Sequence, residues 1–459
     1  MILLSINWAN VGSQILQLIL ALSILVGIHE FGHYITAKWF KCRVEKFYLF
    51  FDPWFSVFKK KVGETEYGIG WLPLGGYVKI AGMVDESMDK EQLAKPPQPW
   101  EFRSKPAWQR LIIMLAGVTM NMLLAFVLYA MVLFVWGESK TKNASVADGI
   151  YCADSLLFKL GFANGDKIVS VNGKTVQYFE DIPGELILAD KVVVNRNGAE
   201  KTIELPKNLL GQLTELKKKG VGFIELRRPN FVGDMSDKFF DTSYAKKAGL
   251  KRYDKIISLD STPIIFFNDM SPILANKKSS TVQIGIERAG VKETLSCQVN
   301  AEGKIGIPPM QEEEMDSLKL ISIDKKEYSF FASFPAGVSK AVEKLGSYTG
   351  QVKRIATPGT EGYKAVGGFK RIASIFPTPW NWQAFWSITA FLSVMLAFMN
   401  LLPIPALDGG HVLFTLIEMI TGRKPSEKFL ERAQIVGMVI LLALMLYANG
   451  NDIFGWGSR

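Results

Sequence analysis

The sequence predicts a polytopic α-helical membrane protein with four transmembrane helices, a membrane-associated β-hairpin or re-entrant loop, and two extracytoplasmic α/β modules. Of its 459 residues, 48% are hydrophobic. About 20 helical residues cross the hydrocarbon core at 1.5 Å per residue. Four segments meet that length with little or no charge, namely residues 11–31, 111–136, 384–407 and the shorter 433–451. An internal repeat in the long insert between the second and third spans predicts the two modules.

The distribution of lysine and arginine predicts the orientation. Residues 38–110 hold 13 of them, residues 409–434 hold four, and residues 1–37 hold none. Cytosolic loops carry the excess positive charge, so both short connections are expected inside and both termini and the insert outside. The first span is not expected to be a cleavable signal peptide, because no basic residue precedes it. The positive-inside distribution accounts for the net charge of +9 without a nucleic-acid partner, and none is expected.

The first span ends in the motif His29-Glu30-Phe31-Gly32-His33. Residues four apart lie on one face of a helix, so both imidazoles can share one metal ion. Glu30 can then take the proton of a metal-bound water. Chance is the alternative, because the motif fixes only three residues. A charge in a span costs roughly 2.5 to 3.5 kcal/mol, and two of the three histidines of the chain are here, which favours a metal site.

Short strands are predicted after the first span, at residues 47–51, 56–62 and 67–72, followed by an apolar, glycine-rich segment at residues 73–82. A sheet edge cannot face lipid unpaired, so this segment is expected to pack on the helices or line a cavity. There its edge would accept an extended peptide as an added strand. A plain surface hairpin is the alternative. Residues 83–103 are predicted to be a cytosolic loop.

A second motif closes the third span. The motif reads Asn400-Leu-Leu-Pro403-Ile-Pro405-Ala-Leu-Asp408-Gly-Gly-His411. Its two prolines are expected to break the helix and to place the carboxylate of Asp408 at the helix end. Spans one and three run in the same direction, so Asp408 is expected at the depth of His29 and His33. Asp408 is the favoured third ligand. His411 is its rival, since a three-histidine site is acceptable chemistry; otherwise His411 is expected to support a ligand by hydrogen bonding.

The insert repeats itself at an offset of 88 residues, residues 161–172 matching residues 249–260, which predicts two copies of one module. Each copy continues into two strands joined by a tight turn, Asn197-Gly198 or Ala289-Gly290. Residues 333–355 carry apolar residues at helical spacing, and either lie on the outer membrane surface or form a buried helix of the second module. Cys152 and Cys297 share a compartment, and separate buried thiols are favoured over a disulfide.

Each copy resembles a PDZ domain, although neither contains the Gly-Leu-Gly-Phe loop that binds a peptide carboxylate. Together, the two metal motifs, the glycine-rich segment and the tandem copies resemble the site-2 protease family of intramembrane zinc metalloproteases, of the bacterial regulator-of-sigma-E type. The resemblance covers nearly the whole chain. It implies Zn²⁺ as cofactor, a membrane re-entrant β-loop at residues 68–82, and the following roles: His29, His33 and Asp408 as ligands, Glu30 as catalytic base, and Asn400, Gly75, Gly76 and Tyr77 as substrate contacts.

The expected division is residues 1–137 for the first two spans and the β-loop, 138–225 and 226–312 for the PDZ-like modules, 313–383 for an amphipathic helical linker, and 384–459 for the last two spans. The expected function is cleavage of membrane-spanning segments in the bacterial inner membrane, after a first extracytoplasmic cut. Substrates would be single-pass proteins of the anti-sigma-factor type, or remnant signal peptides. A zinc transporter is one rival, although spans two and four hold no ionisable path; a catalytically silent PDZ scaffold is the other.

Overall fold

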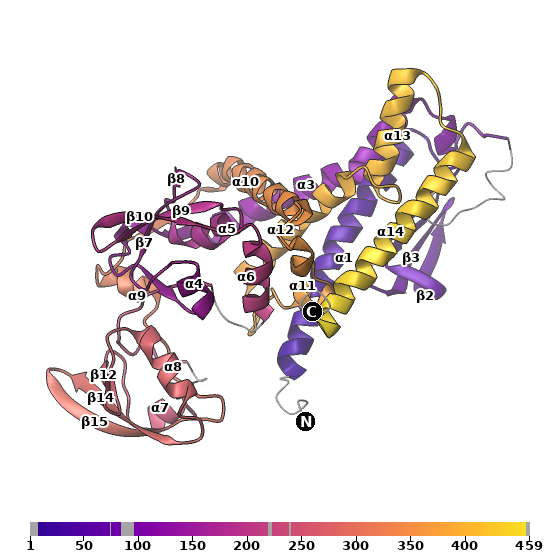
Figure 1. Ribbon diagram of the computed structural model, residues 1–459. Helices are drawn as coiled ribbons and strands as arrows, with labels where there is room; N and C mark the ends of the chain where they lie inside the picture. The colour runs from indigo at the N-terminus through magenta and orange to yellow at the C-terminus, as the bar shows by residue number, and fades with distance from the viewer. Residues whose placement is uncertain (1–7, 74, 84–95, 219–222, 238–239, 456–459) are drawn as a thin grey trace. The chain divides into compact units, whose positions relative to one another are not determined.

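The computed structural model describes residues 8–73, 75–83, 96–218, 223–237 and 240–455 (Figure 1). The chain folds into two compact units. The membrane unit comprises Met1–Gly137, Glu327–Thr357 and Gly362–Arg459, and the insert unit comprises Glu138–Lys326 and Pro358–Glu361. The insert unit is therefore one continuous stretch of chain inserted into the sequence of the membrane unit, together with the four residues Pro358–Glu361.

Four helices of the described residues are long and apolar enough to cross a membrane, and each overlaps one of the four predicted spans. They are α1 (Trp8–Trp39), α3 (Ala107–Trp136), α12 (Trp382–Leu401) and α14 (Glu427–Phe454). The predicted end of the third span at residue 407 is wrong. The helix stops at Leu401 because Leu402 precedes a proline, whose ring disfavours helical backbone in the residue before it; Leu402 is extended, with φ −61° and ψ 140°.

The helix α3 is central to the membrane unit, since it contacts α1, α12, α10 (Phe330–Ala356) and α13 (Asp408–Thr421). Glycines allow two of these approaches. A Cβ on Gly32 of α1 would lie 2.5 Å from the Ala116 carbonyl oxygen of α3, and a Cβ on Gly337 of α10 would lie 2.5 Å from the Ala130 nitrogen. Backbones this close leave no room for a side chain and fix the helix pairs.

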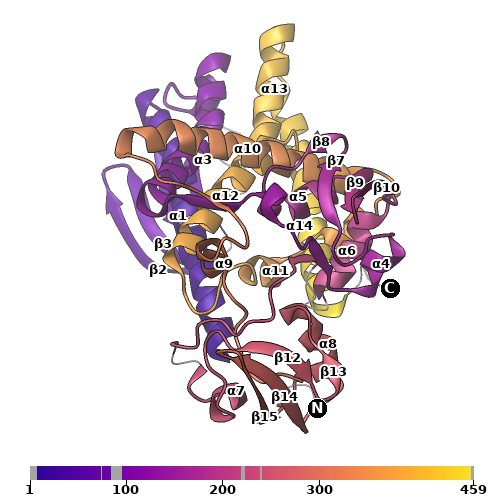
Figure 2. The ribbon, with the colours of Figure 1, turned by 90° about the vertical axis from the view of Figure 1, so that its left-hand side faces the viewer.

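Residues 330–356 form α10, which packs on α3 and α12 within the membrane unit (Figure 2). The alternative that this segment is a buried helix of the second module is therefore wrong. Apolar residues also remain exposed on it, among them Phe331, Phe334 and Val342. Its location on the outer membrane surface stays a prediction.

The segment from Asp408 to Thr421 is helical, which the sequence analysis did not predict. It forms α13 and ends where Gly422 adopts φ 68°. Glycines at the second and third positions of a helix are poor helix formers, yet packing against α3 more than compensates for them.

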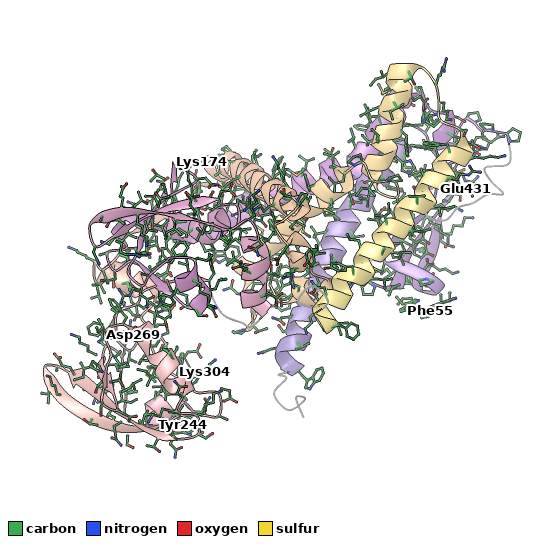
Figure 3. All side chains as sticks on the ribbon, in the orientation of Figure 1. Phe55, Lys174, Tyr244, Asp269, Lys304 and Glu431 are labelled. Atoms are coloured by element: carbon green, nitrogen blue, oxygen red, sulfur yellow. The ribbon has the colours of Figure 1, made fainter. Side chains whose placement is uncertain are left out.

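Four strands follow α1 in one sheet of the order β2-β3-β1-β4: β1 (Val44–Leu49), β2 (Phe51–Val62), β3 (Thr65–Leu72) and β4 (Tyr77–Ile80). The strands β2 and β3 form a hairpin close to the predicted positions, with Phe55 exposed on it (Figure 3). An unpredicted feature is the parallel pairing of β1 with β3. Leu74 and residues 84–95 of the predicted loop lie outside the described residues, and residues 96–98 have no regular structure.

The insert unit contains two sheets of four strands, in the orders β10-β9-β7-β8 and β13-β12-β14-β15. Their strands are β7 (Lys167–Val171), β8 (Lys174–Thr175), β9 (Lys191–Arg196), β10 (Ala199–Glu204), β12 (Lys255–Leu259), β13 (Thr262–Pro263), β14 (Thr281–Arg288) and β15 (Val291–Gln298). The tight turns predicted at Asn197-Gly198 and Ala289-Gly290 join the hairpins, and all four residues have positive φ. The sequence repeat is thus a repeat of topology.

The repeated Asp of each copy has a structural role. Asp166 is fully buried and pairs with Arg196 of β9, with Nε and Oδ1 2.7 Å apart. Asp254 pairs with Arg288 of β14 at the same distance. Each arginine also donates to the carbonyl of the repeated glycine. A buried carboxylate needs such a partner, so the motif fixes a loop against a hairpin rather than forming a catalytic site.

The remaining strands and α-helices of the insert unit are short, and these strands form two separate two-stranded sheets. These elements are β5 (Glu138–Thr141), β6 (Ile150–Cys152), α4 (Ser155–Lys159), α5 (Ile182–Ile187), α6 (Leu209–Lys218), β11 (Ile224–Leu226), α7 (Tyr244–Lys247), α8 (Met270–Ala275), α9 (Glu312–Ser317) and β16 (Ile323–Lys326). The membrane unit adds α11 (Phe369–Ala373).

The two cysteines of the insert are separate thiols, as favoured. Cys152 lies in the core of the first module and Cys297 in that of the second. Burial raises the pKa of Cys152 to about 12 and that of Cys297 to about 11. Only the thiolate reacts, so both thiols are inert in the folded protein.

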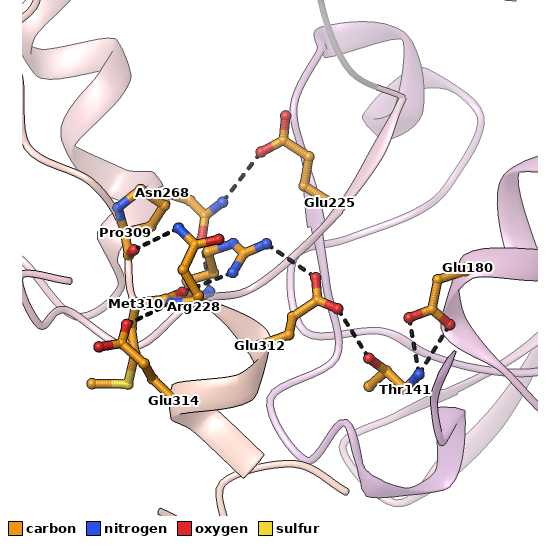
Figure 4. A network of polar contacts seen from close by, with 10 residues as sticks. Thr141, Glu180, Glu225, Arg228, Asn268, Pro309, Met310, Glu312 and Glu314 are labelled. Atoms are coloured by element: carbon orange, nitrogen blue, oxygen red, sulfur yellow. Dashed lines mark hydrogen bonds and ion pairs between the residues drawn. The ribbon is translucent and has the colours of Figure 1, made fainter. Parts of the chain in front are cut away.

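The two ends of the insert are joined to each other. The strand β5 pairs antiparallel with β16, Thr141 opposite Ile323. A polar network beside this pair continues to the junction of the modules (Figure 4): Glu312 accepts from the Thr141 hydroxyl at 3.1 Å and from Arg228 at 3.1 Å. Glu180 accepts from the Thr141 backbone N–H at 2.9 Å. The chain therefore leaves and re-enters the membrane unit at neighbouring points.

Candidate metal centre

Two buried histidines form one side of the candidate metal site. His29 and His33 lie one helical turn apart near the end of α1, with side chains 9% and 8% exposed. Their Nε2 atoms are 3.3 Å apart. The i, i+4 spacing thus brings both rings together as predicted. Space for them depends on Gly117 of α3, where a Cβ would clash with His33 Nε2 and lie 2.6 Å from His29 Cε1.

Asp408 completes the cluster from the first residue of α13. Its Oδ2 lies 3.2 Å from His29 Nε2 and 3.3 Å from His33 Nε2. These three residues form the one group among the described residues whose ligand atoms converge within 4.8 Å. His411, one turn later on α13, lines the same cavity but does not belong to the group.

The distances between its ligand atoms and the types of those atoms both make the cluster suitable for a divalent metal ion. A tetrahedral zinc ion with bonds of about 2.0–2.1 Å holds its ligand atoms about 3.3 Å apart, which matches all three edges of this triangle. Asp408 Oδ2 is also buried without a hydrogen-bond partner among the described residues. Such an acceptor is costly unless a cation satisfies it. Two imidazoles and a carboxylate are ligands that zinc accepts.

The break between α12 and α13 places Asp408. Ala406 adopts φ 78°, a conformation that non-glycine residues rarely take, and its N–H donates to Gln434 Oε1 of α14 at 3.2 Å. A Cβ on Gly410 would lie 2.7 Å from the Ile404 carbonyl oxygen, and a Cβ on Gly437 of α14 would overlap the Pro405 backbone. Close backbone packing and one hydrogen bond therefore hold the strained turn before the carboxylate.

Glu30 faces the cavity that contains the cluster. The cavity has a volume of about 600 Å³, and its walls include His29, His33, Asp408, Gln434 and the strand β4. The Glu30 carboxylate interacts with both histidines and with the backbone N–H of Val78 in β4. A carboxylate in this position is beside the metal ligands without being one of them.

The predicted glycine-rich segment forms one wall of this cavity, with Gly76 and Tyr77 among the lining residues. A Cβ on Gly76 would lie 2.7 Å from the Tyr48 carbonyl oxygen and 3.4 Å from Glu30 Cγ, and one on Gly75 would lie 2.8 Å from the Phe51 ring. The Tyr77 hydroxyl donates to Asp52 at 2.9 Å. Burial and this bond raise the pKa of Tyr77, so Tyr77 stays a neutral donor committed to the sheet.

Asn400 reaches the cluster from the last turn of α12, and its Nδ2 lies 3.2 Å from His29 Nε2. The structure thus places Asn400 directly beside the candidate metal cluster. It brings together the predicted His29, Glu30, His33, Asp408, Asn400 and His411, with Gly76 and Tyr77 in the cavity wall.

Three contributing residues were missed by sequence analysis: Gly117, Asn121 and Gln434. Asn121 of α3 is fully buried, and its Nδ2 lies 3.2 Å from His29 Nδ1. The sequence did contain a signal for it, because an asparagine within an uncharged span is costly unless it has a partner. Gly117 and Gln434 act through contacts between helices, which spacing along the chain cannot indicate.

Comparison with known proteins finds a family and relatives that match over most of the chain. The family model described as "Peptidase family M50" matches residues 17–444. The "Regulator of sigma-E protease RseP" of Escherichia coli is 28% identical over 95% of this chain and 97% of its own. A Neisseria meningitidis protein named "Putative zinc metalloprotease NMA0084" is 28% identical over 96% of this chain and 98% of its own. The likeness therefore extends over the insert as well as the metal motifs.

Proposed function

The chain belongs to peptidase family M50, and from this premise we propose that it is a zinc metalloprotease that cuts peptide bonds within or beside the membrane-spanning segments of other proteins. The observation that carries the proposal is the triangle of His29, His33 and Asp408, with Glu30 in the same cavity. This arrangement does not favour the alternative of a zinc transporter. The cluster shares its cavity with Glu30, which can act as a base, and with the edge strand β4, which can bind a peptide.

His29 Nε2, His33 Nε2 and Asp408 Oδ2 would hold the zinc ion. When bound, zinc supplies Lewis acidity that polarises a carbonyl and makes water acidic. Glu30 accepts a proton from the attacking water and passes it to the leaving amine nitrogen, which is general acid–base chemistry by one carboxylate. The buried setting excludes bulk water from the peptide and strengthens these interactions.

Substrate binding is proposed at β4. A membrane-spanning helix hides its carbonyls in its own hydrogen bonds, so it must unwind before it is cut. The strand β4 is the edge of its sheet and lines the cavity, and an extended substrate that pairs with it would recover those bonds. Gly76 and Tyr77 line this wall, and we propose that they contact the peptide together with the neighbouring Gly75 and the Asn400 amide.

A zinc-dependent assay tests the function. Purified protein is incubated with a single-span model substrate, with and without a zinc chelator, and the products are mapped by mass spectrometry. We expect cleavage in or beside the span, loss with the chelator, and recovery on adding zinc. Cleavage that is unaffected by complete removal of metal would contradict the proposal.

The proposed orientation places both termini and the insert outside the inner membrane and residues 38–110 inside, following the distribution of positive charge. We expect an impermeant maleimide to label K174C, but not P97C, in intact cells. Both positions are exposed, and Lys174 is marked in Figure 3. Asn230 of the insert is unsuitable for labelling because it is buried and donates to two carbonyls.

The wild-type chain is the blank for this labelling, since Cys42, Cys152 and Cys297 are all buried. Lysed cells provide the control, where both introduced cysteines should react. Labelling of P97C from outside intact cells would reverse the orientation and move the proposed cleavage to the opposite face.

The modules of the insert are proposed to be PDZ-like and to admit only substrates that a first extracytoplasmic cut has already shortened. The proposed substrates are single-pass proteins of the anti-sigma-factor type after such a cut, and remnant signal peptides. The insert joins α3 to α10 by chain connection, so a substrate with a bulky outer domain would meet it. The alternative is recruitment through a newly exposed carboxyl terminus.

A deletion separates exclusion from recruitment. Since Thr141 is paired with Ile323, replacing residues 142–322 by Asn-Gly should close the β5–β16 hairpin with little distortion. We expect this variant to cut full-length substrate at least as fast as shortened substrate. Recruitment predicts slower cutting of both, and continued rejection of full-length substrate by a zinc-loaded variant would eliminate the filter.

A further inference from the structure

The two histidine ligands are supported through their Nδ1 atoms by different groups. His33 Nδ1 lies 2.8 Å from the Ile113 carbonyl oxygen of α3. A carbonyl only accepts, so it fixes the proton on His33 Nδ1 and leaves the Nε2 lone pair for a metal. His29 Nδ1 lies 3.2 Å from the Asn121 amide, also on α3. An amide offers both a donor and an acceptor. The position of the His29 ring proton therefore depends on which end of the amide faces Nδ1.

The Asn121 side chain is fully enclosed. It is 0% exposed, and its Oδ1 is a buried atom with no hydrogen-bond partner among the described residues. Its backbone carbonyl is already used, accepting from Ser393 Oγ of α12 at 2.7 Å. A buried amide oxygen without a donor is costly, and His29 is a possible donor within reach of the amide.

The two amide orientations have opposite consequences for His29. With Nδ2 toward the ring, the amide donates to Nδ1, and the ring proton lies on Nε2, where it faces Asp408 Oδ2 at 3.2 Å. That tautomer cannot bind a metal through Nε2. With the amide rotated by 180°, Oδ1 accepts the Nδ1 proton, and the Nε2 lone pair is free.

We propose that Asn121 is a positioning residue that selects the metal-binding tautomer of His29, its Oδ1 accepting the Nδ1 proton when zinc is bound. This rests on the proposed zinc site. The other polar groups that face His29 are His33, Glu30, Asp408 and Asn400. His33, Asp408 and Asn400 approach His29 at Nε2, so Asn121 is the group that governs Nδ1.

The test compares zinc affinities by chelator competition in variants of known hydrogen-bonding capacity. N121L keeps the side-chain size but cannot accept, and we expect its zinc affinity to fall by about 10- to 100-fold, the usual effect of losing such a support. N121D has oxygens at both positions and can always accept, so we expect it to retain zinc at or above the wild-type affinity. N121S, whose hydroxyl is too short to reach the ring, should resemble N121L.

S393A is the matched control, because it removes a buried hydrogen bond to Asn121 without touching His29, and its zinc affinity should equal that of the wild type. Folding is followed for every variant by circular dichroism and elution volume. A second measurement is the ¹⁵N spectrum of histidine-labelled protein, in which only three rings contribute. The His29 signal should report a proton on Nδ1 in zinc-loaded wild type and N121D.

Each outcome has one meaning. Wild-type protein that binds no zinc contradicts the proposed function itself. Zinc-loaded wild type together with unchanged affinity in N121L overturns the role of Asn121 and leaves the function intact. Equal losses in N121D and N121L would show that donation, rather than acceptance, is what His29 requires. If N121L does not fold, N121S and N121D still decide between these results.

Discussion

Glu30→Gln should abolish cleavage of a single-span substrate, by about 100-fold or more, while the protein still binds one zinc ion. The amide preserves the size of the side chain but cannot accept a proton. The three ligand atoms belong to other residues, so the metal site should survive. The measurements are single-turnover cleavage and zinc content on the same preparation.

Glu343→Gln is the control, because it makes the same chemical change on an exposed residue of α10. It should cleave at the wild-type rate. Turnover near the wild-type rate in zinc-loaded E30Q would show that another group moves the proton. Loss of zinc in E30Q would instead mean that Glu30 is part of the metal site, contrary to the geometry.

Local patterns predicted the parts of the fold that depend on local physics. Four apolar segments became helices because a helix satisfies its own backbone in lipid. The repeat became two sheets of the same topology because each copy carries the same buried Asp and the same hairpin turn. By contrast, the end of α12 at Leu401, the helix α13 and the parallel β1–β3 pair were missed. The last two depend on contacts between segments distant in sequence.

The candidate site shows the same division. The four-residue spacing of His29 and His33 is a helical period, and the meeting with Asp408 was anticipated from the common direction of two spans. The contacts that support these three residues from other helices were not predicted. Gly117 makes space for both rings from another helix, and Gln434 reaches the Ala406 turn from α14. Contacts of this kind arise only when the helices pack, so no spacing within one segment indicates them.

Asp408→Ala should remove zinc from the protein and with it all cleavage, whereas His411→Ala should remain zinc-loaded. The carboxylate contributes one corner of a triangle whose edges are 3.2–3.3 Å, and removing it leaves two ligands, one fewer than a catalytic zinc site requires. His411 lies in the cavity wall outside the ligand group. We expect its loss to weaken zinc binding by at most about tenfold, through changed hydrogen bonding.

Zinc content after dialysis against a graded series of chelator concentrations measures both variants on one scale. Asp408→Asn refines the comparison, because it keeps the size and removes the charge, so zinc should be lost here as well if the carboxylate is the ligand. Retention of zinc in both Asp408 variants, with loss in H411A, would assign the third position to His411. A three-histidine site would then require α13 to shift by about 4.5 Å along its axis and to rotate by about 60°, since His411 stands three residues after Asp408 on a helix of 3.6 residues per turn and 1.5 Å rise per residue.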